Sequence, residues 1–129
     1  MKTSPVVVFL AVSCLATAFS AGAEDTAAGF AFFEKKIRPV LVNNCYKCHS
    51  ANAKKLKAGL YLDRKAGWRQ GGESGPTLIP GNPGKSLLLT AIMYKDNDLR
   101  MPPDKKLPKE VLADFEKWIA MGAPDPRDM

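Results

Sequence analysis

An amphipathic segment near residue 35 is the first regular feature in the hydrophobic pattern of the chain. Four of its apolar residues recur at helical spacing: Phe30, Phe33, Ile37 and Leu41. They would lie on one face of a helix, which the pattern predicts from about Ala27 to Val42. We expect Pro39 to interrupt this helix, because proline lacks an amide proton and is costly in a helix interior.

A second amphipathic helix is predicted close to the C-terminus, starting near Pro108. Its apolar residues follow the same helical spacing: Val111, Phe115, Trp118 and Ile119. We expect this helix to end at Gly122, since Pro124 and Pro126 prevent it from resuming.

Shorter elements are predicted between these two helices. Asn82 is a suitable N-cap and Pro83 suits the first helical position, so we expect a helix that runs to about Tyr94. Residues 60–63 are predicted to be either a very short strand or an extended loop. Residues 64–70 are predicted to form a helical turn, and residues 72–84 a loop rich in glycine and proline. The pattern as a whole indicates one all-α domain with about four or five helices.

The first 23 residues have the pattern of a secretory signal peptide. Lys2 precedes an apolar run over residues 5–12, and small residues lead to an A-x-A site that ends at Ala23. A membrane anchor is the alternative, but the run is short against the roughly 20 apolar residues that span a bilayer. We therefore predict cleavage of residues 1–23, which removes Cys14, and export of residues 24–129 to the periplasm or another extracytoplasmic space without a transmembrane segment.

The net charge of +6 for the 129 residues falls by one when Lys2 is removed with the signal peptide. A basic exported protein is expected to favour an acidic protein partner, whereas export makes nucleic acid an improbable partner. Several lysines cluster in sequence near the cysteine motif and near Met101: Lys35, Lys36, Lys47, Lys54, Lys55, Lys57, Lys105, Lys106 and Lys109. They could form a docking face for an acidic redox protein or simply make a basic surface.

The candidate chemistry lies in Cys45-Tyr46-Lys47-Cys48-His49. A structural zinc site needs four ligands, and the mature chain offers only two cysteines and one histidine. A redox dithiol of the thioredoxin kind follows a strand, whereas this pair follows a predicted helix. The spacing C-x-x-C-H is instead that of covalent haem c attachment. Cys45 and Cys48 would form thioether bonds to the two vinyl groups of one haem, and His49 would bind the iron.

A second axial ligand must come from another residue type, because His49 is the only histidine. Met93 lies in a helical apolar stripe, Met121 at a helix end and Met129 at the terminus. Met101 precedes Pro102-Pro103 in a stiff loop, which favours it as the iron ligand over a role in filling a hydrophobic gap.

Histidine and methionine together raise the reduction potential and leave no open coordination position on the iron. We therefore predict an electron carrier that works by outer-sphere transfer, and not an enzyme. The alternatives are a haem-containing sensor or docking module and a subunit of a larger haem enzyme. The bulkiest aromatic residues are expected to pack on haem or at a helix crossing: Phe33, Trp68, Phe115 and Trp118.

The chain resembles the class I c-type cytochromes, and more closely the planctomycete-type cytochrome c domain, over about Phe30 to Pro126. The resemblance is carried by "FFEKKIRPVLVNNCYKCHS", "GLYLD", "GGESGPTLIPGNPGKSLLLTAI", "MPPDKKLP" and "WIAMGAP", in that order. It implies crossed terminal helices around one haem, with His49 and Met101 as axial ligands. It also implies that a Gly-Pro segment offers a carbonyl to the axial imidazole, which makes Pro76 the candidate for orienting His49.

Overall fold

The computed structural model describes residues 26–127, so the predicted signal peptide and Met129 lie outside the described residues. The described chain is all-helical, as predicted, with five α-helices and no strand. Within residues 26–127, no helix combines the length and the apolar character needed to cross a bilayer.

The N-terminal helix is continuous from Ala27 to Asn44, and it contains α1 (Ala27–Phe32), the π-helical turn η1 (Phe33–Ile37) and α2 (Arg38–Asn44). It begins after Thr26, whose hydroxyl oxygen accepts a hydrogen bond from the amide of Gly29 at 3.1 Å. Pro39 does not break this helix. The turn before it widens, so that the Arg38 amide donates to the carbonyl of Phe33, five residues back. This wider turn accommodates a residue that cannot donate a helical hydrogen bond.

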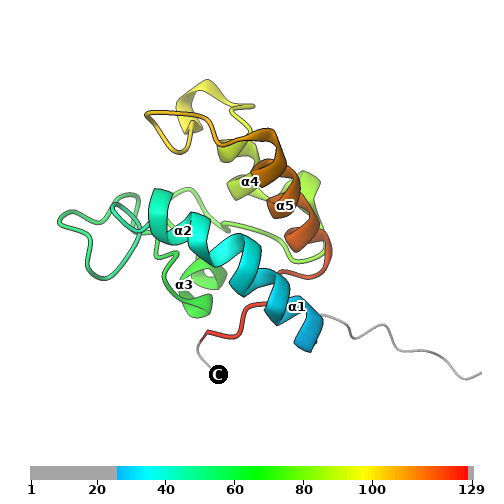
Figure 1. Cartoon of the computed structure of the whole chain (residues 1–129). Helices are drawn as coiled ribbons and strands as arrows, with labels where there is room; N and C mark the ends of the chain where they lie inside the picture. The colour runs from blue at the N-terminus through cyan, green and yellow to red at the C-terminus, as the bar shows by residue number, and fades with distance from the viewer. Residues whose placement is uncertain (1–25, 128–129) are drawn as a thin grey trace, which may run out of the picture.

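The second predicted long helix is α5 (Lys109–Ala120), and it packs across η1 of the N-terminal helix (Figure 1). Pro108 is its N-cap, and Gly122 adopts a φ of 96° just after its end, a conformation that glycine tolerates without strain. The crossing of the terminal helices implied by the family resemblance is therefore present.

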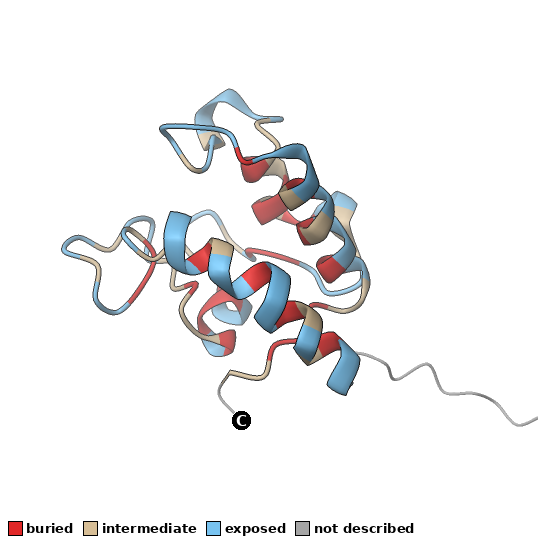
Figure 2. Ribbon diagram, viewed as in Figure 1, coloured by how far each residue is buried: buried red, intermediate tan, exposed pale blue. Residues whose placement is uncertain are grey.

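The core lies at this crossing, and Figure 2 shows buried residues gathered where the helices face each other. Trp118 is at its centre, with ring-centroid distances of 5.7 Å to Phe33, 6.1 Å to Phe115 and 6.2 Å to Trp68. All four aromatic side chains are at most 2% exposed. These are the aromatics that we expected on haem or at a helix crossing, and the structure places them at the crossing.

Three shorter elements connect the long helices: α3 (Lys65–Gln70), the 3₁₀ turn η2 (Pro83–Lys85) and α4 (Leu87–Ile92). The helix expected from Pro83 to Tyr94 is therefore shorter than predicted. Asn82 caps as expected, its side chain accepting from the Lys85 amide, but Ser86 turns extended with a ψ of 114° and separates the two elements. A further 3₁₀ turn, η3 (Asn97–Leu99), follows α4.

Residues 60–63 form an extended loop, so the strand alternative was wrong. The amide of Leu62 donates to the carbonyl of His49 at 2.8 Å, so residues 60–62 run beside the cysteine motif. They do not form the regular backbone hydrogen bonds of a β-strand pair.

The C-terminal stretch after α5 runs below α1 in the view of Figure 1, and Ala123, Pro124 and Asp125 in it are buried. The indole N–H of Trp118 donates to the carbonyl of Pro124 at 2.9 Å, and that of Trp68 donates to the carboxylate of Asp125 at 3.0 Å. A Cβ on Gly29 would lie 2.7 Å from the Pro124 ring, so only glycine lets α1 approach this closely. The C-terminal segment is thus part of the core.

Candidate haem site

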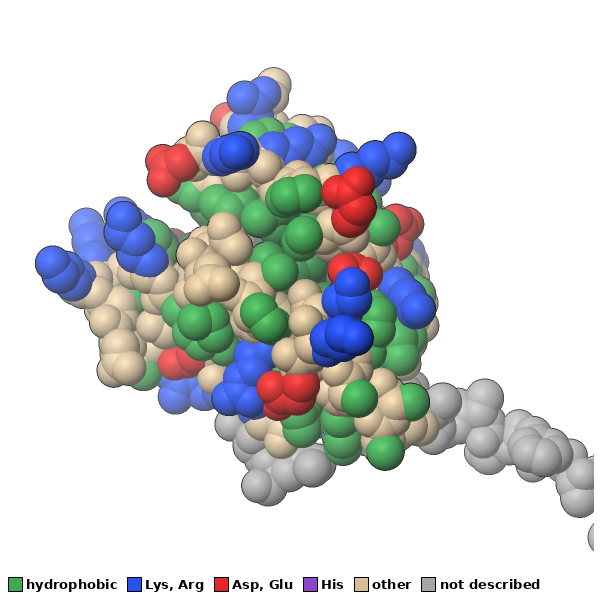
Figure 3. Space-filling model, viewed as in Figure 1, with side chains coloured by type: hydrophobic (Ala, Val, Ile, Leu, Met, Phe, Trp, Pro, Cys, Tyr) green, Lys and Arg blue, Asp and Glu red, His purple; other side chains and the backbone are tan. Residues whose placement is uncertain are grey.

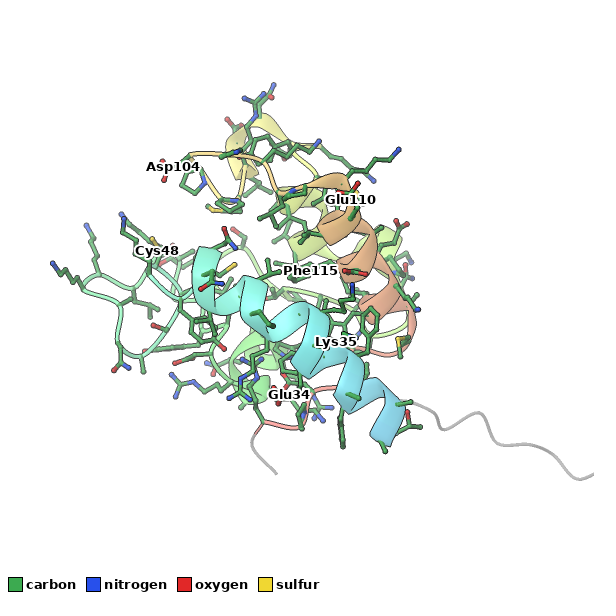
Figure 4. All side chains as sticks on the ribbon, viewed as in Figure 1. Glu34, Lys35, Cys48, Asp104, Glu110 and Phe115 are labelled. Carbon is green, nitrogen blue, oxygen red and sulfur yellow. The ribbon has the colours of Figure 1, made fainter. Side chains whose placement is uncertain are left out.

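The segment that carries the two cysteines leaves α2 as a tight turn. The amides of Cys48 and His49 both donate to the carbonyl of Cys45, at 3.1 and 2.9 Å. This turn brings the side chains of Cys45, Cys48 and His49 to the wall of one cavity. In Figure 4, Cys48 lies beside the end of α2, at the opening between the lower and upper parts of the molecule.

The cavity has a volume of about 280 Å³ and is bounded by chain segments that are far apart in sequence. Its lining comes from residues 44–49, 57–62, 72–77, 87–92 and 99–103. Figure 3 shows the molecule hollowed between the loop at the left and the upper part. Apolar side chains such as Leu60, Leu88 and Ile92 form much of the wall, which suits a flat hydrophobic ring.

His49 is 8% exposed, and burial lowers its pKa from the ordinary value. The ring is therefore neutral near pH 7, as binding to a metal requires. Its Nδ1 lies 3.3 Å from the carbonyl oxygen of Leu60. A carbonyl in this position fixes the orientation of the ring and leaves Nε2 as the nitrogen available to iron.

This contact differs from the one we expected for Pro76. The carbonyl beside His49 belongs to Leu60, because residues 57–62 fold back along the cysteine motif. Gly75 and Thr77, on either side of Pro76, both line the cavity. Pro76 as the orienting residue stays a prediction.

Cys45 and Cys48 carry free thiols in this structure. Burial, together with the neighbouring Cys48, raises the pKa of Cys45 to about 12. A nucleophilic redox cysteine needs the opposite, a lowered pKa that keeps it as thiolate. The surroundings of Cys45 therefore do not favour a redox dithiol.

Met101 lines the same cavity as His49, and its side chain comes from residues 99–103 in the upper part of the molecule. Its amide donates to the carbonyl of Ala91 at 3.1 Å, which ties this segment to α4, and Met101 itself is 37% exposed. Met93 packs against the hydrophobic core, and Met121 follows the end of α5. Of the described methionines, Met101 is the one that lines the cavity.

One residue of the cavity lining has a buried polar group without a partner. Thr77 is 4% exposed, and its hydroxyl oxygen has neither a hydrogen-bond partner nor contact with solvent. Leaving such a group unpaired is costly, so Thr77 is a candidate partner for a polar group bound in the cavity, provided that the hydroxyl turns toward it. Haem is a largely apolar ring with two vinyl groups, so the apolar wall and the two thiols fit it.

The lysines of the predicted docking face are distributed over several elements. Lys57 lines the cavity, and the loop over residues 51–59 that contains it lies on one side of the hollow, with residues 100–107 on the other (Figures 1 and 3). Lys36 instead lies on the N-terminal helix, where its Nζ is 3.6 Å from Asp114.

These features are those of a c-type cytochrome domain, which implies haem c as the cofactor. A family comparison agrees: residues 45–105 match the family described as Planctomycete cytochrome C. The match over residues 45–105 confirms the resemblance seen in the sequence. Neither the curated proteins nor the solved structures contain a match to the chain.

The sequence alone did not indicate Leu60 or Thr77 as site residues. Every residue has a carbonyl, so only the path of the chain selects Leu60. Thr77 directly follows Gly75-Pro76, the segment from which Pro76 was predicted as a site residue, and this adjacency is the sequence feature that could have indicated Thr77.

Proposed function

We propose that the mature protein is an exported monohaem c-type cytochrome that carries single electrons between redox partners. The observation that supports this most is that Cys45, Cys48, His49 and Met101 all line one apolar cavity. Haem bound there would supply a one-electron iron couple. Cys45 and Cys48 would hold it covalently, and His49 and Met101 would serve as axial ligands.

The roles of these residues favour transfer over catalysis. Two protein ligands leave no coordination position for a substrate, and a neutral His49 held by the Leu60 carbonyl keeps its orientation in both oxidation states. A sensor or docking module and a subunit of a larger haem enzyme remain the competing functions, and the sensor or docking module predicts slow electron exchange with small redox proteins.

The ligand set can be tested on protein exported together with the haem-maturation machinery. Intact mass should exceed that of the polypeptide by one haem. Met101→Ala should lower the midpoint potential and change the ferric spectrum, because a thioether opposite histidine raises the potential. Met93→Leu is the matched control, since Met93 packs on the core. An unchanged spectrum in Met101→Ala would refute the axial role of Met101, and a bare polypeptide mass would refute the whole proposal.

The docking partner is proposed to be an acidic redox protein that approaches the lysine-bearing loop beside the cavity. Lys54→Gln and Lys55→Gln together should slow reduction by such a partner and weaken its dependence on ionic strength. Lys85 is exposed and does not line the cavity, so Lys85→Gln is the control. Transfer that is slow and insensitive to salt in the unmodified protein would favour the sensor alternative.

A further inference from the structure

Tyr94 links the end of α4 to the segment that carries Met101. It follows the C-cap of α4, and its φ of 60° turns the chain away from the helix axis. Its hydroxyl donates a hydrogen bond to the carbonyl of Pro102, the residue after Met101. One side chain therefore connects a helix of the cavity wall to the peptide beside the candidate ligand.

Two cations also contact the ring of Tyr94: Arg100, which precedes Met101, and Lys106, which follows it. The guanidinium carbon of Arg100 lies 5.6 Å from the ring centroid, and Nζ of Lys106 lies 5.8 Å from it. Both distances are within the range of an attractive cation–π contact. The ring and hydroxyl together thus meet residues before and after Met101.

The segment over residues 100–106, here called the methionine loop, has few other attachments. Pro102 is half-buried and the other six residues are exposed, so little apolar burial holds the loop in place. Apart from the Tyr94 contacts, the hydrogen bonds of the loop lie at its start, where the amide of Met101 donates to the carbonyl of Ala91 and the guanidinium of Arg100 donates to the side-chain oxygen of Asn97. A thioether is a weak ligand, so its position relative to iron depends on what holds the loop.

We propose that Tyr94 is a positioning residue for Met101, holding the methionine loop so that the thioether faces His49 across the cavity. This inference rests on the proposed function, in which Met101 binds iron. Without the Tyr94 anchor, the loop spends more time away from the cavity, and an external ligand takes the position of the thioether more readily.

The test uses the full-length haem-loaded protein and its ferric affinity for imidazole, which competes with Met101. Tyr94→Phe removes only the hydroxyl and keeps the ring that contacts Arg100 and Lys106. Because one hydrogen bond is lost, imidazole affinity should rise by about 3- to 10-fold, and the methionine-to-iron charge-transfer band should weaken. Tyr94→Leu, which also removes the cation–π contacts, should give a larger rise.

Tyr61→Phe is the matched control, because the ring of Tyr61 also carries a cation, Arg64, at 4.2 Å, but does not line the cavity. It should leave imidazole affinity unchanged. Replacing Arg100 and Lys106 by Gln keeps the hydroxyl and should raise the affinity less than Tyr94→Leu does. This variant supplies a second readout if Tyr94→Leu fails to fold.

Met101→Ala separates failure of this inference from failure of the proposed ligation. If Met101→Ala alters the spectrum while Tyr94→Phe binds imidazole like the unmodified protein, the role of Tyr94 is refuted and the ligation stands. If Met101→Ala leaves the spectrum unchanged, both are refuted.

Discussion

Arg127 makes the most extensive set of buried polar contacts in the described chain, and its removal is the sharpest test of the fold. The Arg127 side chain is 7% exposed, and it pairs with Asp125, which is 0% exposed, at 2.6 Å. One of its nitrogens also donates to the Tyr46 hydroxyl at 2.8 Å and to the Leu62 carbonyl at 2.7 Å. The guanidinium carbon lies 4.8 Å from the ring centroid of Phe33.

The cost of Arg127→Ala follows from these contacts. It removes the cation that neutralises a fully buried carboxylate, and breaking a buried pair in this way costs about 3–5 kcal/mol. The lost hydrogen bonds to Tyr46 and Leu62 are part of the same network, so their effects are not simply additive. At about 4–8 °C per kcal/mol for a domain of this size, the melting temperature should fall by at least about 12 °C.

Urea unfolding of the haem-loaded protein, followed by far-UV circular dichroism, measures this cost. Arg38→Ala is the control, because Arg38 pairs with Glu34 at 2.8 Å on the surface, where both side chains are more than 40% exposed. An exposed pair of this kind is worth about 0.3–0.5 kcal/mol. If Arg127→Ala were no more costly than Arg38→Ala, the C-terminal segment would not be held by this network.

Three further predictions follow from the same structure. Burial alone would raise the pKa of Asp125, but hydrogen bonds from Arg127 and Trp68 outweigh it and lower the pKa. The ionised carboxylate therefore stabilises the fold fully above about pH 4, and this contribution is lost as the pH falls toward the folded-state pKa. The stability of Asp125→Asn in acid unfolding should consequently approach that of the wild type only at low pH. Gly67→Ala places a Cβ 2.4 Å from the Tyr61 carbonyl and should cost about 1–3 kcal/mol in a thermal melt, while Gly84→Ala, with 3.8 Å to its nearest atom, should be nearly neutral. Thr77→Val keeps the shape of the side chain but removes the buried hydroxyl, so the midpoint potential should fall if that hydroxyl binds a haem carboxylate, and an unchanged potential would contradict this contact.

The long helices were predictable because their buried faces depend on local spacing. Phe33, Ile37 and Leu41 are at most 2% exposed, as their period predicted. The π-helical turn was not predictable from Pro39 alone, since a proline can end a helix, kink it or widen the turn before it. The strand alternative over residues 60–63 failed because their backbone pairs with the cysteine motif.

The attachment motif of the candidate site was readable because covalent attachment fixes both residue types and spacing. Met101 was selected by its loop setting, and the structure places it in the same cavity as His49. The Leu60 carbonyl could not be foreseen, because it depends on a loop folding back over 11 residues.

The C-terminal charges were the least predictable part of the core. Asp125 and Arg127 follow a helix and alternate with Pro124 and Pro126, a setting that usually indicates an exposed segment. Their burial depends on indole and backbone partners from distant segments, and helical periodicity carries no information about such contacts.

The aromatic cluster gives the protein a built-in optical reporter. The sequence contains two tryptophans, Trp68 and Trp118, and both lie in this cluster. Tryptophan emission therefore originates from one buried region where α3, α5 and the N-terminal helix meet, and haem bound in the neighbouring cavity would quench it until the protein unfolds. A red shift of that emission during denaturation reports the moment when water reaches this junction, without any added label.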